Sequence, residues 1–172
     1  ASGNLDGEPG DELVLSAATA PSSSDDGLLY VLTKLGTIST WVEGYADLDL
    51  SQASVFRQAM FQGNGGEMAG FSIDVGDVDA DGFGDILIGA PYYTDYSIAF
   101  GMGYVVYGEH NMASYAGASA YSLPDMSVLA TYYGDRVGLL GYASGPSQAG
   151  WAMRAAHLDG DEWLDVVVGL PW

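Results

Sequence analysis

Short apolar segments closed by turn residues set the pattern of this chain. Residues 86–88 form an uninterrupted apolar run that ends at Gly89 and Pro91, and similar runs occupy 13–15 and 166–168. Such short runs, rich in branched aliphatic residues and bounded by Gly and Pro, are typical of β-strands. Because every position is apolar, instead of every second one, we expect these strands to be buried on both faces.

The apolar runs belong to a longer repeat. The runs at 13–15 and 166–168 lie 73 residues before and 80 residues after the middle run, and residues 149–151 match 69–71 at the same offset of 80. One unit contains four strand-like segments, which in the complete middle unit are predicted near 69–76, 85–90, 103–108 and 126–133. Repeats of this length are a signature of solenoids and propellers.

The repeat and the buried strands predict an all-β fold of β-propeller blades, each a four-stranded antiparallel sheet between similar neighbours. A two-sheet sandwich is the alternative, although its strands would alternate more cleanly. The predicted blades are approximately 1–62, which lacks its first strand, 63–134, and 135–172, which has only its first two strands. Because incomplete blades leave open edges, we expect either a fragment of a longer propeller or copies that associate.

An acidic loop precedes the middle apolar run. It carries carboxylates at positions 1, 3, 5 and 9, which are Asp77, Asp79, Asp81 and Asp85. Four carboxylates this close repel one another unless a cation lies between them, and Ca²⁺ takes six to eight oxygen ligands. The Phe83 carbonyl at position 7 would add a ligand, and Gly82 at position 6 would allow a sharp turn with positive φ. The loop therefore predicts a calcium site.

Two other kinds of loop share part of this pattern. An Asp- and Gly-rich turn needs no metal, but it does not require four acids in phase. An EF-hand would need a Glu at position 12, between helices, where this chain has Ile88 in a predicted strand.

The acidic loop recurs in both neighbouring units with changes. The later copy has His157 at position 1 and Glu162 in place of Gly, while its remaining acids, Asp159, Asp161 and Asp165, are candidates for a weaker ion. The earlier copy carries Asn4, Asp6, Glu8 and Glu12, with Pro9 where Gly is wanted. Proline does not adopt positive φ, so a solvated acidic turn is an equal alternative to a metal site there.

Composition narrows the function classes. Acidic residues outnumber basic ones 23 to 4, for a formal charge of −19, which excludes binding to nucleic acid or to anionic membrane surfaces. The chain has no cysteine, and hence neither a disulfide nor a thiol site. No apolar run approaches the roughly 18 residues of a membrane span.

Glycine, at 25 of 172 residues, is about twice its average usage, as expected for many tight turns.

These residues resemble the FG-GAP repeat, the unit of the integrin α-subunit β-propeller and of many bacterial surface proteins. The likeness rests on the acidic loop, the hydrophobic strand after it, and the closing residues Gly89, Ala90 and Pro91, while the Phe-Gly pair is changed to Ala69-Gly70 and Ala149-Gly150. The resemblance implies a seven-bladed propeller. It also implies Ca²⁺ bound by Asp77, Asp79, Asp81, the Phe83 carbonyl and Asp85.

From these features we expect a non-catalytic, calcium-binding segment that serves extracellular adhesion or ligand recognition, with an unidentified protein or glycan as ligand. The alternatives are the accessory propeller of a secreted hydrolase or lipase, and an acidic scaffold adapted to high salt. Against an enzyme, residues 145–150 lack the G-x-S-x-G spacing of a nucleophile elbow. The two histidines, His110 and His157, both lie in polar loops.

Overall fold

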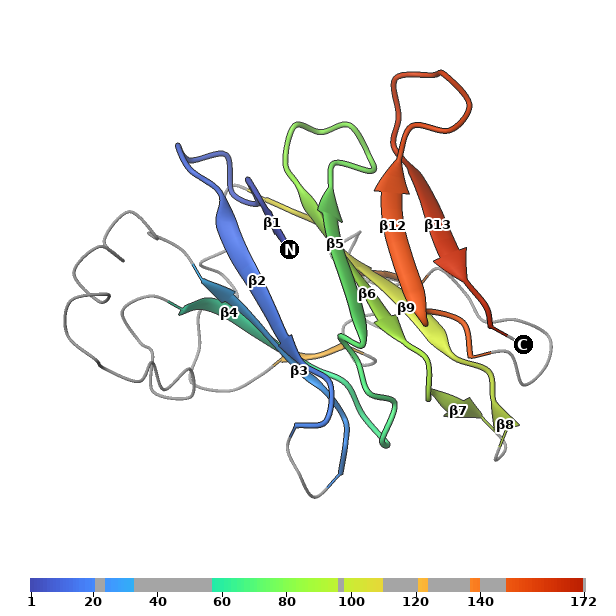
Figure 1. The fold of residues 1–172 in the computed structure, drawn as a ribbon. Helices are drawn as coiled ribbons and strands as arrows, with labels where there is room; N and C mark the ends of the chain where they lie inside the picture. The colour runs from blue at the N-terminus through green and yellow to red at the C-terminus, as the bar shows by residue number, and fades with distance from the viewer. Residues whose placement is uncertain are drawn as a thin grey trace, which may run out of the picture.

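The described strands form four sheets, of which three stand side by side and the fourth is a short pair of two-residue strands, β7 and β8 (Figure 1). The computed structural model describes residues 1–20, 24–32, 57–95, 98–109, 121–123, 137–139 and 148–171. In chain order its strands are β1 (Ser2–Gly3), β2 (Glu12–Ala17), β3 (Leu28–Leu32), β4 (Arg57–Gln62), β5 (Ser72–Gly76), β6 (Asp85–Ala90), β7 (Thr94–Asp95), β8 (Ile98–Ala99), β9 (Met102–Val106), β10 (Tyr121–Ser122), β11 (Val137–Leu139), β12 (Ala152–Ala156) and β13 (Asp165–Gly169).

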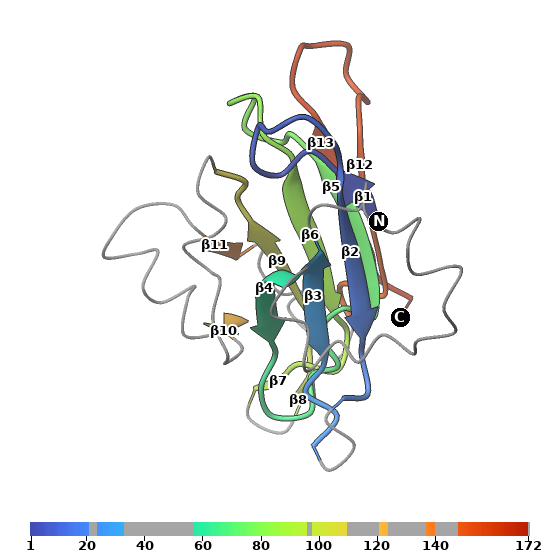
Figure 2. The ribbon, with the colours of Figure 1, turned by 90° about the vertical axis from the view of Figure 1, so that its left-hand side faces the viewer.

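The sheet topology is that of successive blades. The first sheet has the order β1-β2-β3-β4-β10, the second β11-β9-β6-β5, and β12 pairs with β13 in the third. Sequential strands within these sheets pair antiparallel, while β10 joins β4 in parallel. The turned view in Figure 2 places β10 and β11 on the side of the molecule away from β1, β5 and β12. The prediction of all-β propeller blades is confirmed.

The observed strands also refine the predicted segments. Strand β6 has the predicted bounds of 85–90, whereas β5 starts three residues later than expected and β9 is shifted by one or two residues. The predicted strand at 126–133 lies outside the described residues, and β11 is the fourth strand of the second sheet. A two-residue strand, β1, lies in the first sheet, where the sequence predicted that the first strand is lacking. The blade boundaries at 62 and 134 stay predictions.

Side chains from β6 enter two separate cores. Ile86 and Ile88 are fully buried in a core that also contains Leu29 and Val31 of β3. Leu87, between them in sequence, is fully buried in a second core with Met153 of β12. Because successive strand residues point to opposite faces, a strand that separates two cores must be apolar at every position. This arrangement confirms the predicted burial on both faces for β6 and differs from a sandwich, which has one core between two sheets. The prediction is wrong for the other two runs, because Leu13 and Leu15 of β2 are only partly buried and Val167 of β13 is 42% exposed.

The sheets meet where a glycine of one sheet contacts the Ala-Gly pair at the start of the next. A Cβ atom on Gly101 would lie 2.2 Å from both the nitrogen and the oxygen of Ala149. One repeat earlier, a Cβ on Gly27 would lie 2.1 Å from the oxygen of Ala69. The alanine amides donate hydrogen bonds across the same junctions, from Ala69 to the Asp26 carbonyl at 2.9 Å and from Ala149 to the Phe100 carbonyl at 3.0 Å. Adjacent sheets are thus joined through backbone contacts that repeat along the chain.

In the part of the chain that the structure describes, no helix has the length and apolar character needed to cross a membrane.

Candidate metal centre

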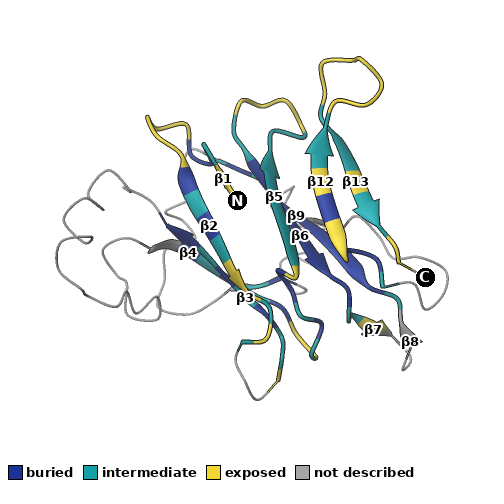
Figure 3. Cartoon of the chain, in the orientation of Figure 1, coloured by how far each residue is buried: buried dark blue, intermediate teal, exposed yellow. Residues whose placement is uncertain are grey.

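Three acidic loops lie at the same end of the molecule (Figure 1). Each loop connects the first strand of a sheet to the second, β1 to β2, β5 to β6 and β12 to β13. Their tips, including residues 7–11, 79–82 and 157–163, are exposed (Figure 3). The repeat of the sequence therefore places three related loops side by side on one face.

The three loops share a hydrogen-bond pattern that shapes the backbone. The carboxylate at position 9 accepts the amide of position 2, as in Leu5 to Glu12 at 2.8 Å, Val78 to Asp85 at 2.7 Å and Leu158 to Asp165 at 2.8 Å. The carboxylate at position 3 accepts the amide of position 5, as in Glu8 to Asp6 at 2.9 Å, Asp81 to Asp79 at 3.2 Å and Asp161 to Asp159 at 3.0 Å. Acids at these positions thus build the turn in addition to any role in metal binding.

Position 4 is the turn residue that all three loops share. Gly7, Ala80 and Gly160 all occupy it, with φ of 75°, 58° and 87°. At position 6, where the sequence predicts a sharp turn with positive φ, Gly82 has φ of 94°. Because position 4 already turns the chain in every copy, Pro9 and Glu162 at position 6 do not prevent the loops from forming.

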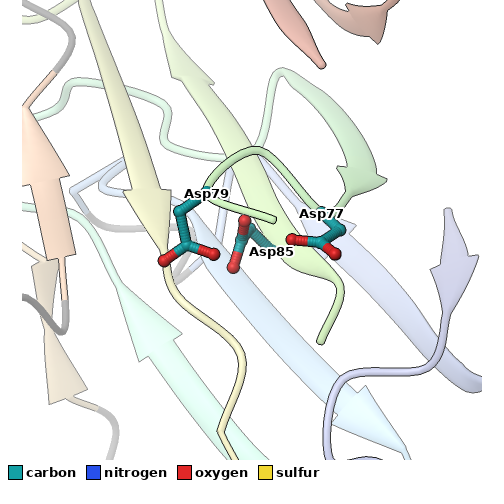
Figure 4. Close-up of side chains that lie close together, drawn as sticks. All are labelled: Asp77, Asp79 and Asp85. Atoms are coloured by element: carbon teal, nitrogen blue, oxygen red, sulfur yellow. The ribbon is translucent and has the colours of Figure 1, made fainter. Parts of the chain in front are cut away.

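Asp77, Asp79 and Asp85 point toward one another in the second loop (Figure 4). One ligand oxygen of each lies within 4.8 Å of those of the other two. Because Ca²⁺ binds oxygen at about 2.3–2.6 Å, two of its ligands stand at most about 5 Å apart, so the three oxygens fit around one ion. No other group of three acidic or histidine side chains among the described residues comes together in this way. The second loop is therefore a candidate metal centre.

Asp85 anchors the centre from the buried side. Its side chain is fully buried, and its two oxygens accept the amides of Val78 at 2.7 Å and of Gly108 at 2.9 Å. Burial raises the pKa of Asp85 to about 6, and the charges of Asp79 and Asp81 act in the same direction, while the two amides lower it. The pKa of Asp79 is raised by desolvation and then by Asp81 and Asp77. A cation between these carboxylates would offset their mutual repulsion.

The structure does not bring Asp81 into this group. Its Oδ1 accepts the amide of Phe83 at 2.8 Å, and its own amide donates to Asp77 at 3.1 Å. Asp77 also accepts the amide of Gly82 at 3.0 Å. Asp81 therefore orders the turn in this structure, and its predicted role as a ligand, like that of the Phe83 carbonyl, stays a prediction.

The third loop differs at position 1. The Nδ1 atom of His157 lies 2.9 Å from the carbonyl oxygen of Trp163, which is position 7, the carbonyl that the motif assigns to the metal. Its predicted ligands, Asp159, Asp161 and Asp165, each accept a backbone amide and do not form a converging group of three. A weaker ion at these residues stays a prediction.

Backbone hydrogen bonds join the first loop to the second loop and to the segment after β9. The amide of Gly84 donates to the carbonyl of Asn4 at 2.6 Å, and that of Glu109 donates to Leu5 at 3.1 Å. Asp6 and Glu12 are buried, and desolvation raises the pKa of Glu12. An acidic turn that is solvated throughout therefore does not describe this loop, because two of its acids are covered by neighbouring structure.

An aromatic cluster lies at the other end of β5, opposite the acidic loops. Phe71, just before β5, and Trp151, just before β12, have ring centroids 4.7 Å apart. Tyr92 completes the cluster, at 6.4 Å from Phe71 and 6.2 Å from Trp151. Phe71 and Trp151 remain 40% and 39% exposed. The sequence placed Tyr92 beside a loop, but only the packing shows that three rings from neighbouring sheets share one exposed surface.

Successive antiparallel sheets with an acidic loop between their first two strands define blades of a β-propeller that carry a candidate metal centre. Residues 69–106, from the Ala-Gly pair to the end of β9, match the FG-GAP repeat. This part of the chain is therefore an FG-GAP repeat, and the resemblance inferred from its motifs is confirmed.

The chain is also similar to a curated protein, the phosphatidylinositol-glycan-specific phospholipase D of Dictyostelium discoideum. The two are 26% identical over 176 residues, which cover 98% of this chain and 17% of that protein. The chain thus spans about a sixth of the length of this relative.

Proposed function

We propose that this chain is a calcium-binding segment of an FG-GAP propeller that serves adhesion or ligand recognition outside the cell and carries no catalytic residues of its own. The observation that carries the proposal is the convergence of Asp77, Asp79 and Asp85 within 4.8 Å in the FG-GAP loop. A hard cation with flexible geometry suits three carboxylates on one short loop better than a transition metal, since the loop offers only oxygen ligands.

The proposed role of the ion is structural. Asp77 and Asp79 come from the loop and Asp85 from the first residue of β6, so an ion held by all three would fix the connection between β5 and β6. Extracellular calcium modules bind at about 10⁻⁴ to 10⁻³ M. If the site has an affinity in this range, it would be filled outside cells, where the proposal places the segment.

The proposed recognition surface is the aromatic cluster of Phe71, Tyr92 and Trp151. Exposed aromatic rings on loops offer an apolar face for a sugar ring or for a protein side chain. Phe71 keeps its 40% exposure although the next sheet is already packed beside it. The net charge of −19 disfavours an anionic ligand. A neutral glycan or a protein is therefore the proposed ligand class.

The accessory propeller of an enzyme is the second candidate. The observation that favours it is the similarity to a phospholipase D along 98% of this chain. In that case the segment would position a separate catalytic domain or its substrate. The sequence next to this segment in the complete protein discriminates the two, since a catalytic domain supports the accessory role and a membrane or wall anchor supports adhesion.

Thermal unfolding with and without calcium tests the metal site. We compare the chain in EDTA and in millimolar Ca²⁺ at fixed ionic strength, beside a variant with Asp79→Ala and Asp81→Ala. With a dissociation constant of about 10⁻⁴ to 10⁻³ M, about 1 mM calcium adds roughly 0.4–1.4 kcal/mol, which is a rise in Tm of about 1–6 °C for a chain of this size. We expect the rise in the native chain and its loss in the double variant.

The matched control carries Asp159→Ala and Asp161→Ala in the third loop. It should keep most of the calcium response, because its acids do not converge in the structure. A native Tm that is the same in EDTA and calcium contradicts the metal site. Aromatic recognition is tested separately, by glycan-array binding of the native chain and of Trp151→Ala.

A further inference from the structure

A buried acid joins the first sheet to the second. Glu67 lies in the segment between β4 and β5 and is 1% exposed. Its two carboxylate oxygens lie 3.0 and 2.8 Å from the hydroxyl of Tyr104, which donates from β9 and is itself fully buried. An acid from the connection between two blades is thus held in the interior against the second blade.

The surroundings of Glu67 supply no compensating positive charge among the described residues. On the side of the first sheet, Asp26 carries a like charge that disfavours an ionised Glu67. The backbone of Asn64 hydrogen-bonds with Glu67, and Gly63 packs against the Glu67 carboxyl group. From the second sheet, it meets Tyr104, and Tyr93 faces Tyr104 in turn. A buried carboxylate without a cationic partner is costly in its ionised form.

The backbone around Glu67 carries the contacts between the two sheets. The amide of Tyr92 donates to the Glu67 carbonyl at 3.2 Å. The amides of Met68 and Ala69 donate to the backbone carbonyls of Asp25 and Asp26 at 3.0 and 2.9 Å. A rearrangement of Glu67 to reach water would therefore strain hydrogen bonds on both sides of the junction.

We propose that Glu67 is a proton-controlled joint between the two blades, closed when its carboxyl carries a proton and loosened when that proton is lost. In the neutral form one oxygen carries the proton and the other accepts the Tyr104 hydroxyl, so no charge is buried. In the ionised form the carboxylate needs water that the closed junction excludes. The joint holds the backbone of Tyr92 and lies four residues before Phe71, so its state bears on the aromatic cluster; that last consequence rests on the proposed function.

The direction of the effect follows from burial. Desolvation raises the pKa of Glu67 from 4.5 to about 7, against the hydrogen bond from Tyr104, which lowers it. Because the folded-state pKa lies above the unfolded value, the stabilisation is complete below pH 4.5 and is lost as the pH rises through about 7. The junction is therefore tightest in mild acid.

Unfolding as a function of pH tests the joint. We measure urea unfolding of the native chain and of Glu67→Gln between pH 4.5 and 8.5 in constant calcium. Because both proteins contain the other acids, the pH dependence due to those acids cancels in the comparison. Each unit by which the folded-state pKa of Glu67 exceeds the unfolded value changes the unfolding constant tenfold. With values of about 7 and 4.5, the ratio of the unfolding constants of the two proteins should change by up to about 300-fold over this range. Glu162→Gln, which removes an exposed acid at a loop position that supplies no predicted metal ligand, is the matched control and should follow the native profile.

Parallel pH profiles for the native chain and Glu67→Gln overturn the proposal. If Glu67→Gln does not fold, Tyr104→Phe replaces it, because losing the hydrogen bond that favours the ionised form moves the transition to higher pH. A carbon-13 titration of the Glu67 carboxyl reports the same group directly, and a midpoint near 4.5 also overturns the proposal. The pH experiment is run in constant calcium, and the calcium experiment changes no group near Glu67. The proposed joint and the proposed metal site can therefore each fail without the other.

Discussion

Replacing Gly101 by alanine tests whether the sheets are joined through close backbone contacts. Gly101 has φ of 74°, and a Cβ there would lie 2.2 Å from the backbone nitrogen and oxygen of Ala149. Real Cβ atoms do not approach backbone atoms so closely, and neither partner is a flexible side chain that can move aside. The substitution must therefore separate β9 from the start of the third sheet.

The expected loss combines two costs. A residue with Cβ at positive φ costs roughly 1–2 kcal/mol, and overpacking at a close contact costs roughly 1–3 kcal/mol. The sum is about 2–5 kcal/mol, which corresponds to a fall in Tm of about 4–20 °C for a chain of this length. Part of that cost is the hydrogen bond from the Ala149 amide to Phe100, which spans the same junction at 3.0 Å.

Gly65→Ala is the matched control, since Gly65 has φ of 63° but nothing within 4 Å of the added Cβ. It carries only the backbone cost, reduced by the lower entropy of the unfolded chain, so about 1 kcal/mol is expected. Thermal and urea unfolding in constant calcium measure both variants. Equal losses for Gly65→Ala and Gly101→Ala would refute the close-contact argument, because they would show that backbone conformation alone accounts for the effect.

Two further predictions concern the acidic loops. Asp85→Ala should destabilise the chain by about 2–4 kcal/mol even in EDTA, because it leaves the amides of Val78 and Gly108 without their acceptor; equal stability in EDTA would show that Asp85 serves only the metal. His157→Asp restores the acid that Asp77 supplies in the second loop, so calorimetry should detect one additional calcium per chain, and an unchanged stoichiometry would contradict the equivalence of the two loops.

The strands and the acidic loop between β5 and β6 were largely predictable because both rest on local patterns. The bounds of β6 follow from an apolar run between Asp85 and Pro91, and the phase of the aspartates predicted the second loop. The starts of β5 and β9 were less accurate, because the Ala-Gly and glycine contacts that precede them are set by the neighbouring sheet and not by local propensity.

The different roles of Asp81 and Asp85 could not be predicted from a local pattern. Asp81 and Asp85 look alike in the motif, but Asp85 is buried beneath the amides of Val78 and Gly108, whereas Asp81 is exposed and bonds to Phe83. Gly108 lies 23 residues from Asp85, so no local pattern signals that contact.

The sequence by itself determined the all-β architecture, the repeat and the acidic character of the second loop, because spacing and side-chain type dictate strand periodicity and the places of the carboxylates. Only the tertiary structure decided which carboxylates converge, which three rings share the exposed cluster, and that Glu67 faces Tyr104. Within GNGGEMAG a lone glutamate reads as part of a polar turn. Its burial depends on a tyrosine 37 residues later, which the packing of one blade against the next brings into contact.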